Sequence, residues 1–591
     1  MVSVRWRCHR VGIVYLRATV RRTKGGELVR YLQLAHNERN ERGVPVARVI
    51  HNFGREDRLD REALVRLVRS IQRFLGGEET LRASTPEGFR FVGAPEVGGP
   101  HVLDQLWLQL GIGRAITRVA GRGRGRGRSG VERAVFTMVC QRCLEPASKL
   151  EATRWLGRDV VVDGIEAVSD DELYRAMDFL LACSERVQES VFFSLANLLN
   201  LEVDVIFFDT TSTYFEADVD DEDAEGEEGP ADESAAAASG PLRRLGHSKD
   251  HRPDLPQVVI GLAVTREGIP VRVWVWPGNR NDQTLVAQVK TDLAGWRLGR
   301  AIYVVDSGLS GRDNLRHLRS GGGHYIAGVK LRSGMPETEQ ALSRQGRYRT
   351  VKDNLRVKEV RVGDGEAAVR YLVCHNPAEA ERDRLHRQQR IGRIERELAR
   401  LAEQRQRAKT KAEREAHLRG ECALRDHPTL SRYLRQSPSG RLSLDRAKIT
   451  AEERLDGKYL LTTSDPSLSA EDVALGYKQL QEAERSFRDL KGTLLLRPVF
   501  HRKDDRIRAH VLICFLALVL VRLAETRSDE TWRTIRAELG QIRQGHFQSQ
   551  DGDFSQTSEL TTRQRDLHAQ LAVAEPPRFG RITPATTAQP A

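Results

Sequence analysis

Two short apolar runs stand out near the middle of the chain. Residues 203–208 read VDVIFF and are followed by Asp209, and residues 301–305 read AIYVV and are followed by Asp306. Apolar runs of this length predict short strands that are buried on both faces of a sheet. Ligands bind beyond the carboxyl ends of such strands, so we expect the two aspartates to lie close together at that edge.

The sequence between and after these runs predicts a regular order of elements. Residues 258–264 and 271–276 are apolar enough to form two more strands, and residues 281–298 have the spacing of a helix. The order is therefore strand, strand, strand, helix, strand. A later run, KYLLTT at 458–463, predicts a strand that returns to the same sheet.

Other stretches have hairpin or helical patterns. Residues 1–55 alternate apolar and basic positions, which predicts a small β-rich module of hairpins. Apolar positions at helical intervals predict helices within 101–116, 131–144 and 171–200. The longest apolar run, 511–521, has eleven residues. A membrane span needs about twenty, so we expect a buried helix there.

Charge interrupts the apolar pattern in three places. Residues 330–457 begin with polar, strand-like sequence and pass into a charged stretch, 378–419, that predicts an amphipathic hairpin or coiled coil. The repeat GRGRGRGRSG at 121–130 is interpreted as flexible, either as a basic linker or as a grip on DNA. Eleven acidic side chains within 216–233 predict a self-repelling loop.

The overall charge indicates the class of partner. The chain has 94 Lys and Arg residues, a net charge of +12 and a pI of about 9.5, which favour a polyanion such as nucleic acid. Seven cysteines in 591 residues do not make a disulfide framework. Cys140 and Cys143 stand in an apolar helical pattern, so we expect core cysteines rather than metal ligands.

A third candidate carboxylate lies in the stretch 477–501. Tyr477, Glu484 and Lys491 recur every seven residues, nearly two helical turns, so on one helix their side chains would share a face. With the two aspartates that follow the apolar runs, the glutamate would complete a site of three carboxylates. Such a site suits two divalent cations that act in phosphoryl transfer.

Four stretches of this chain resemble the DDE transposases of the IS4 superfamily, in particular the IS1634 family. They are FFDTTSTYFE at 207–216, LGHSKDHRPDLPQVVIGLAVTREGIPVRVWVWPGN at 245–279, VVDSGLSGRDNL at 304–315, and the stretch 477–501. The superfamily signature is Y-x2-R-x3-E-x6-K, and Leu480 stands where the arginine is usual. This leucine either leaves the face one phosphate contact short or is buried.

The resemblance implies an α/β catalytic core of the RNase H-like type with an inserted β/helical domain, an N-terminal β-rich module and a helical domain. It implies cut-and-paste transposition through strand cleavage and strand transfer. Catalysis would fall to Asp209, Asp306 and Glu484, holding two Mg²⁺ or Mn²⁺ ions. The DNA-binding side chains would be Tyr477, Lys491, Arg488, Lys249 and Arg252.

These patterns divide the chain into six predicted segments. They are a β-rich module with a helix (1–90), a helical domain that binds DNA ends (91–200), the first part of the catalytic core (201–329), the insertion domain (330–457), the second part of the core (458–530) and a polar tail (531–591).

The expected partner is double-stranded DNA, both the element ends and the target, with no membrane partner. We expect a homodimer in the DNA complex, because two ends must be brought together, and a cytoplasmic bacterial protein that is nucleoid-associated when bound. Two other functions stay open from the sequence. One is a catalytically inactive relative that only occupies element ends, and the other is an RNase H-fold nuclease without strand transfer.

Overall fold

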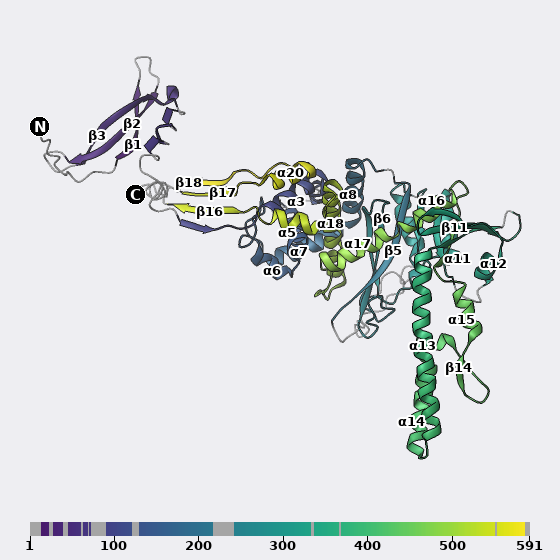
Figure 1. The fold of residues 1–591 in the computed structure, drawn as a ribbon. Coiled ribbons are helices and arrows are strands. Elements are labelled where there is room, and N and C mark those ends of the chain that lie inside the picture. The colour runs from purple at the N-terminus through teal and green to yellow at the C-terminus, as the bar shows by residue number, and fades with distance from the viewer. Residues whose placement is uncertain are drawn as a thin grey trace, which may run out of the picture. The chain divides into compact units, whose positions relative to one another are not determined.

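The computed structural model describes residues 14–584, apart from gaps at 23–27, 40–44, 61–62, 65, 69, 72–89, 121–128, 202, 217–240, 299, 332–335, 366–367 and 550–551. The predicted Gly-Arg repeat and acidic loop fall largely in these gaps and so outside the described residues. The chain forms two compact units, which are described separately (Figure 1). Unit 1 comprises Met1–Phe91, Phe547–Asp553 and Thr583–Ala591, and unit 2 comprises Val92–His546 and Phe554–Ile582.

Unit 1 contains the predicted β-rich module. An antiparallel sheet is formed by β1 (Val14–Arg22), β2 (Leu28–Arg39) and β3 (Pro45–Arg55), in that order, and the short helix η1 (Glu56–Arg58) follows. Val29 and Ala35, which are six residues apart and therefore on one face of β2, are buried. The hairpin prediction is confirmed for these strands.

A nine-stranded mixed sheet is the centre of unit 2. Its order is β10–β11–β12–β15–β9–β8–β5–β6–β7. β8 pairs in parallel with both β5 and β9, and the other neighbours are antiparallel. The strands are β5 (Val205–Tyr214), β6 (Gln257–Val264), β7 (Pro270–Pro277), β8 (Ile302–Val305), β9 (His324–Val329), β10 (Arg349–Lys352), β11 (Leu355–Val362), β12 (Val369–His375) and β15 (Lys458–Thr463).

Helices cover both faces of this sheet. Successive residues of a strand point to opposite faces, and Phe207 and Phe208 of β5 accordingly belong to different core clusters. Phe208 clusters with residues of α10 (Val286–Gly295), whereas Phe207 clusters with residues of α17 (Gln481–Arg488). The predicted order of strand, strand, strand, helix and strand is confirmed, as β5, β6, β7, α10 and β8.

The helices before the sheet do not form a core of their own. Residues of these helices share one hydrophobic cluster with α18 (Asp504–Ser528), and Cys140 and Cys143 are buried in it, as predicted. By length and composition α18 would suffice to cross a membrane, yet 94% of its most apolar window is buried within the structure. The helices are α3 (Gly98–Gln109), α4 (Ile112–Ala120), α5 (Ser129–Leu144), α6 (Lys149–Trp155), α7 (Asp170–Ala182) and α8 (Ser184–Leu198).

The predicted insertion, 330–457, has two parts. Its strands β10, β11 and β12 extend the central sheet, joined to it through β15. The remainder has its own small core, which includes Ile394, Leu401 and Leu424, and its two long helices stand out from the sheet side by side (Figure 1). These elements are α13 (Pro377–Arg407), α14 (Lys411–Arg425), β13 (Leu434–Gln436), β14 (Leu442–Leu444) and α15 (Arg446–Glu453).

The segment expected as a polar tail, 531–591, instead contains regular structure. Trp532, Leu539 and Leu571 are buried in the main core, and the indole nitrogen of Trp532 donates a hydrogen bond to the carbonyl of Cys143 at 2.9 Å. A few widely spaced apolar residues are enough for this polar segment to fold, because each packs into an existing core. The elements are α19 (Trp532–Leu539), β16 (Gln544–Ser549), β17 (Gly552–Thr557), α20 (Thr562–Leu571) and β18 (Phe579–Pro584).

Candidate active site

Strand register brings the two predicted aspartates together. Phe208 of β5 lies opposite Val305, the last residue of β8, so Asp209 and Asp306 follow at the same level on neighbouring parallel strands, which lie about 4.8 Å apart. Asp306 directly follows its strand, as predicted. The prediction that Asp209 ends its strand is wrong, because β6 continues the pairing of β5 as far as Tyr214.

Glu484 reaches the same face of the sheet from α17. Asp209 points to the same side as Phe207, two residues earlier, and Phe207 shares a core cluster with Ala483 and Phe487 of α17. The three carboxylates line one open pocket of about 640 Å³. The other lining residues are Thr210, Thr211, Lys249, Phe487, Arg488, Lys491, Gly492 and Arg497.

The charges in this pocket repel one another. Burial raises the pKa of Asp209 to about 6, and the charges of Asp306 and Glu484 add to the rise, while Lys249 opposes it. One oxygen of Asp306 accepts backbone N–H groups of Gly308 and Leu309, at 2.9 and 3.1 Å. Asp306 is therefore held in place, while the ionised state of Asp209 is disfavoured.

The donor set suits a hard divalent cation. The acidic side chains that line the pocket offer only oxygen, which Mg²⁺ prefers, and a cation between them would relieve the repulsion at Asp209. Among the residues that the structure describes, no three His, Cys, Asp or Glu side chains converge closely enough to hold an ion on their own. The carboxylates thus share a pocket without meeting at one point.

The stretch 477–491 is not one continuous helix, and the prediction of a single helical face is wrong. Tyr477 belongs to α16 (Ala470–Lys478), Glu484 to α17, and Lys491 to a π-helical turn, η7 (Asp489–Thr493). Gln479 and Leu480 separate α16 from α17, and the side chain of Leu480 is only 7% exposed within the main core. The leucine is therefore buried and does not face a phosphate.

Tyr477 lies beside the pocket and does not line it. Its ring stacks on Tyr459 with centroids 6.0 Å apart. Burial raises the pKa of Tyr477 to about 12, and the three carboxylates contribute to the rise. The phenol is therefore protonated and close enough to the acids to sense their charge.

Lys491 lines the pocket but already has a partner. Its ammonium donates to both carboxylate oxygens of Asp250, at 2.9 and 3.1 Å, and Arg497 contacts the same carboxylate at 2.8 Å. The loop that carries Asp250 has a left-handed residue next to it, His251 at φ 59°. The sequence reasoning missed this role of Asp250, although its place in the GHSKDHRPD motif, next to Lys249, was a signal.

The other predicted DNA-binding residues divide into two groups. Lys249 and Arg488 line the pocket, and the Lys249 ammonium donates to the carbonyl and hydroxyl oxygens of Thr210, both at 2.6 Å. Arg252 does not line the pocket. It pairs with Asp254 at 2.8 Å and lies over the ring of Tyr214.

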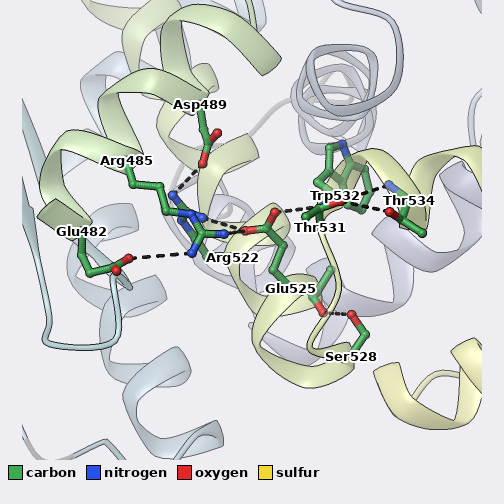
Figure 2. Close-up of polar contacts among 10 residues, drawn as sticks. Glu482, Arg485, Asp489, Arg522, Glu525, Ser528, Thr531, Trp532 and Thr534 are labelled. Carbon is green, nitrogen blue, oxygen red and sulfur yellow. Dashed lines mark hydrogen bonds and ion pairs between the residues drawn. The ribbon is translucent and has the colours of Figure 1, made fainter.

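The opposite side of the α17 segment carries a network of ion pairs. Figure 2 shows Arg522 of α18 between two acids: it contacts Asp489 of η7 and Glu525 of α18, both at 2.6 Å. Arg485 of α17 reaches Glu525 at 3.3 Å, and Glu525 also accepts the backbone N–H of Trp532 at 2.9 Å. The network connects the segment that carries Glu484 and Lys491 to the buried helix α18.

The chain matches two family models. Residues 219–520, just over half of the chain, match the family described as transposase DDE domain, and residues 16–83 match the IS1634 family transposase N-terminal domain. No curated protein matches the chain. Among solved structures, it is similar to a piggyBac transposase synaptic complex with hairpin DNA, with 8% identity, a TM-score of 0.34, and coverage of 76% of this chain and 82% of that chain. The match over half of the chain shows that it belongs to the DDE transposases, enzymes that cleave DNA and catalyse its transposition, and the N-terminal match supports the IS1634 family among them.

Proposed function

We propose that Asp209, Asp306 and Glu484 form the catalytic site of this transposase, in an RNase H-like core of the IS4 superfamily. The observation that supports this most directly is their convergence on one pocket from β5, the end of β8 and α17. The raised pKa of Asp209 adds to it, because perturbed carboxylates are common at catalytic sites.

The three carboxylates would hold two Mg²⁺ or Mn²⁺ ions. Such ions, when bound, activate an oxygen nucleophile and stabilise the leaving oxygen of a phosphodiester. The basic side chains at the rim of the pocket would instead hold the DNA strand. Lys249, Arg488, Lys491 and Arg497 would bind the phosphates next to the cleaved bond.

The carboxylate of Asp250 would be displaced from Lys491 and Arg497 when DNA binds. Its carboxylate lies between Lys491 and Arg497, where it gives each cation an anionic partner and a fixed position. A DNA phosphate has the same charge and the same kind of oxygen acceptors. The ion pairs would therefore be exchanged for phosphate contacts, with Lys491 and Arg497 already oriented.

Cut-and-paste excision by a dimer would follow from the same site. Excision needs both element ends cut and then joined to a target, and two copies of the chain would supply one such site for each end. The helical region that contains α3 to α8 would contribute to the recognition of the ends. The reaction would take place on bacterial DNA in the cytoplasm.

Detection of joined products tests this proposal against its alternatives. The substrate is a DNA fragment with the element end, labelled and incubated with Mg²⁺ and a plasmid target. Wild type should yield cleaved and joined DNA, whereas Asp209→Asn and Asp306→Asn should bind DNA and yield neither. Cleavage without joining would favour a nuclease, and binding without cleavage by wild type would favour an inactive relative.

A further inference from the structure

The helical arm formed by α13 and α14 carries far more charge than its packing requires. Residues 377–425 contain 14 Lys and Arg residues and 9 Asp and Glu residues. The core of the arm uses only one side of each helix, with Ile394, Leu401 and Leu424 among its residues. Much of the remaining surface of the two helices is exposed.

Ion pairs neutralise parts of α13. Arg382 pairs with Glu379, Arg384 with Glu381 and Arg400 with Glu397, each three residues apart on the helix. These pairs lie on either side of a stretch, 385–396, that contains Arg390 and Arg393. Arg387 of this stretch pairs with Asp456 and Glu453, whereas no ion pair is found for Arg390 or Arg393 among the described residues.

A pocket of about 400 Å³ opens at this stretch. Arg390 is half-buried and Arg393 is exposed, and with His386 they lie at helical positions i, i+4 and i+7, along one face of α13. The lining contains no carboxylate. The residues that line it are His386, Gln389, Arg390, Arg393, His427, Thr429 and Leu430.

A second basic pocket lies toward the end of the arm. Arg405, Arg414, Arg425 and Arg441 line it, with Glu421 as the lining carboxylate. Arg390 and Arg405 are fifteen residues apart on one helix, which corresponds to about 22 Å. Two basic pockets at this spacing fit an extended polyanion better than a single small anion, since duplex DNA carries one charge per about 1.7 Å of its axis.

We propose that the pocket of Arg390 and Arg393 binds a backbone phosphate of duplex DNA, so that the arm is a second DNA contact outside the carboxylate pocket. Guanidinium groups suit this task because they bind phosphate through paired hydrogen bonds. The proposal rests on the assigned function, a transposase that acts on DNA. It adds a surface that holds DNA without taking part in cleavage.

The test compares two double variants of α13 with equal loss of charge. Arg390→Ala with Arg393→Ala removes the pocket cations, and Arg382→Ala with Arg384→Ala, the control, removes two cations that already have glutamate partners. The probe is a labelled 30-base-pair duplex of arbitrary sequence, and its affinity is measured at several salt concentrations. The pocket variant should lower the slope of log affinity against log salt by about 0.9 to 1.8, and the control by less than about half of that.

Two further measurements test whether a change in binding comes from lost stability or from a site for small anions. Arg393→Glu changes only an exposed residue, so it should weaken binding without a change in thermal melting. Inorganic phosphate, at the same ionic strength as a chloride control, should not displace the duplex at millimolar concentration. Equal slopes for the two double variants, or displacement by phosphate alone, would overturn the proposal.

The outcome can be separated from that of the catalytic site. The arm variant should lower the slope by the same amount in an Asp209→Asn background as in wild type, because the carboxylate change does not touch the arm. If Asp209→Asn still cleaves DNA, the catalytic assignment fails and the arm is unaffected. If the arm variant binds like wild type while Asp209→Asn is inactive, only the arm proposal fails.

Discussion

The segment around α17 has two sides, and the buried charges are arranged differently on each. On the pocket side, Asp209, Asp306 and Glu484 repel one another, and the pKa of Asp209 rises to about 6. On the other side, Arg522 lies between two acids at 2.6 Å, and its side chain is 4% exposed (Figure 2). The ion pairs of this balanced side connect the segment to α18, and we propose that the charged groups of the pocket side serve binding and catalysis.

The balanced side should be the more sensitive to mutation. Arg522→Ala would leave Asp489 and Glu525 without their buried cation, and breaking a buried pair in this way costs about 3–5 kcal/mol. Denaturant unfolding measures the change. Arg485→Ala is the matched control, since its side chain is 47% exposed and such pairs contribute less than about 1 kcal/mol. Equal losses for the two variants would contradict the comparison.

The next largest effect should come from Leu480, which lies between α16 and α17. Leu480→Arg would bring a charge into the main core and should lower the free energy of unfolding by more than about 2 kcal/mol. Leu480→Met keeps the volume and should cost less than about 1.5 kcal/mol. Thermal melting and DNA affinity are measured together. Tighter DNA binding by Leu480→Arg at unchanged stability would show that this side chain faces DNA.

On the pocket side, Asp209 should make the stability of the fold depend on pH. The fold raises the pKa of Asp209 from an ordinary value near 3.8 to about 6, so its ionised form destabilises the folded state. In the absence of metal, stability should therefore fall as the pH rises from about 4 to about 6. Asp209→Asn should stabilise the protein at pH 8, by at most about 3 kcal/mol, and have little effect at pH 4. Thermal melting at both pH values, in a chelator, tests this, and a destabilised variant at pH 8 would refute it.

The smallest effect should come from Asp250. Asp250→Asn would keep the shape of the carboxylate but free part of the charge of Lys491 and Arg497, so DNA affinity should rise several-fold at low salt, on the order of 1 kcal/mol. Asp254→Asn, which frees only Arg252 outside the pocket, is the control. Weaker binding by Asp250→Asn alone would mean that the carboxylate is needed to orient the two cations in the DNA complex.

Sequence reasoning succeeded where the pattern is local. The apolar runs before Asp209 and Asp306 predicted their strands, because a strand buried on both faces needs little else. It failed where distant contacts decide. β5 continues past Asp209 because β6 pairs with it as far as Tyr214, and the helix that a seven-residue spacing predicted is interrupted at Gln479 and Leu480. Asp250 is close to Lys491 only in the fold.

The segment after residue 530 illustrates the same limit. Its composition is polar, yet Trp532 and Leu571 are buried in a core that belongs mainly to other helices. A single apolar residue in a polar sequence says little about burial until its neighbours in space are known. The seven-residue spacing, by contrast, correctly singled out Glu484 and Lys491 as pocket residues, although α17 passes into a π-helical turn between them.

Cleavage by Glu484→Gln tests the central claim most directly. The control is Glu482→Gln, two residues away on the same helix, where the carboxylate pairs with Arg485 instead of lining the pocket. Both variants are assayed with Mg²⁺ on a labelled element end, at DNA concentrations that give equal occupancy. The account predicts that Glu484→Gln loses cleavage by at least about a hundredfold, with binding retained, and that Glu482→Gln cleaves at nearly the wild-type rate. Wild-type cleavage by Glu484→Gln would contradict the account.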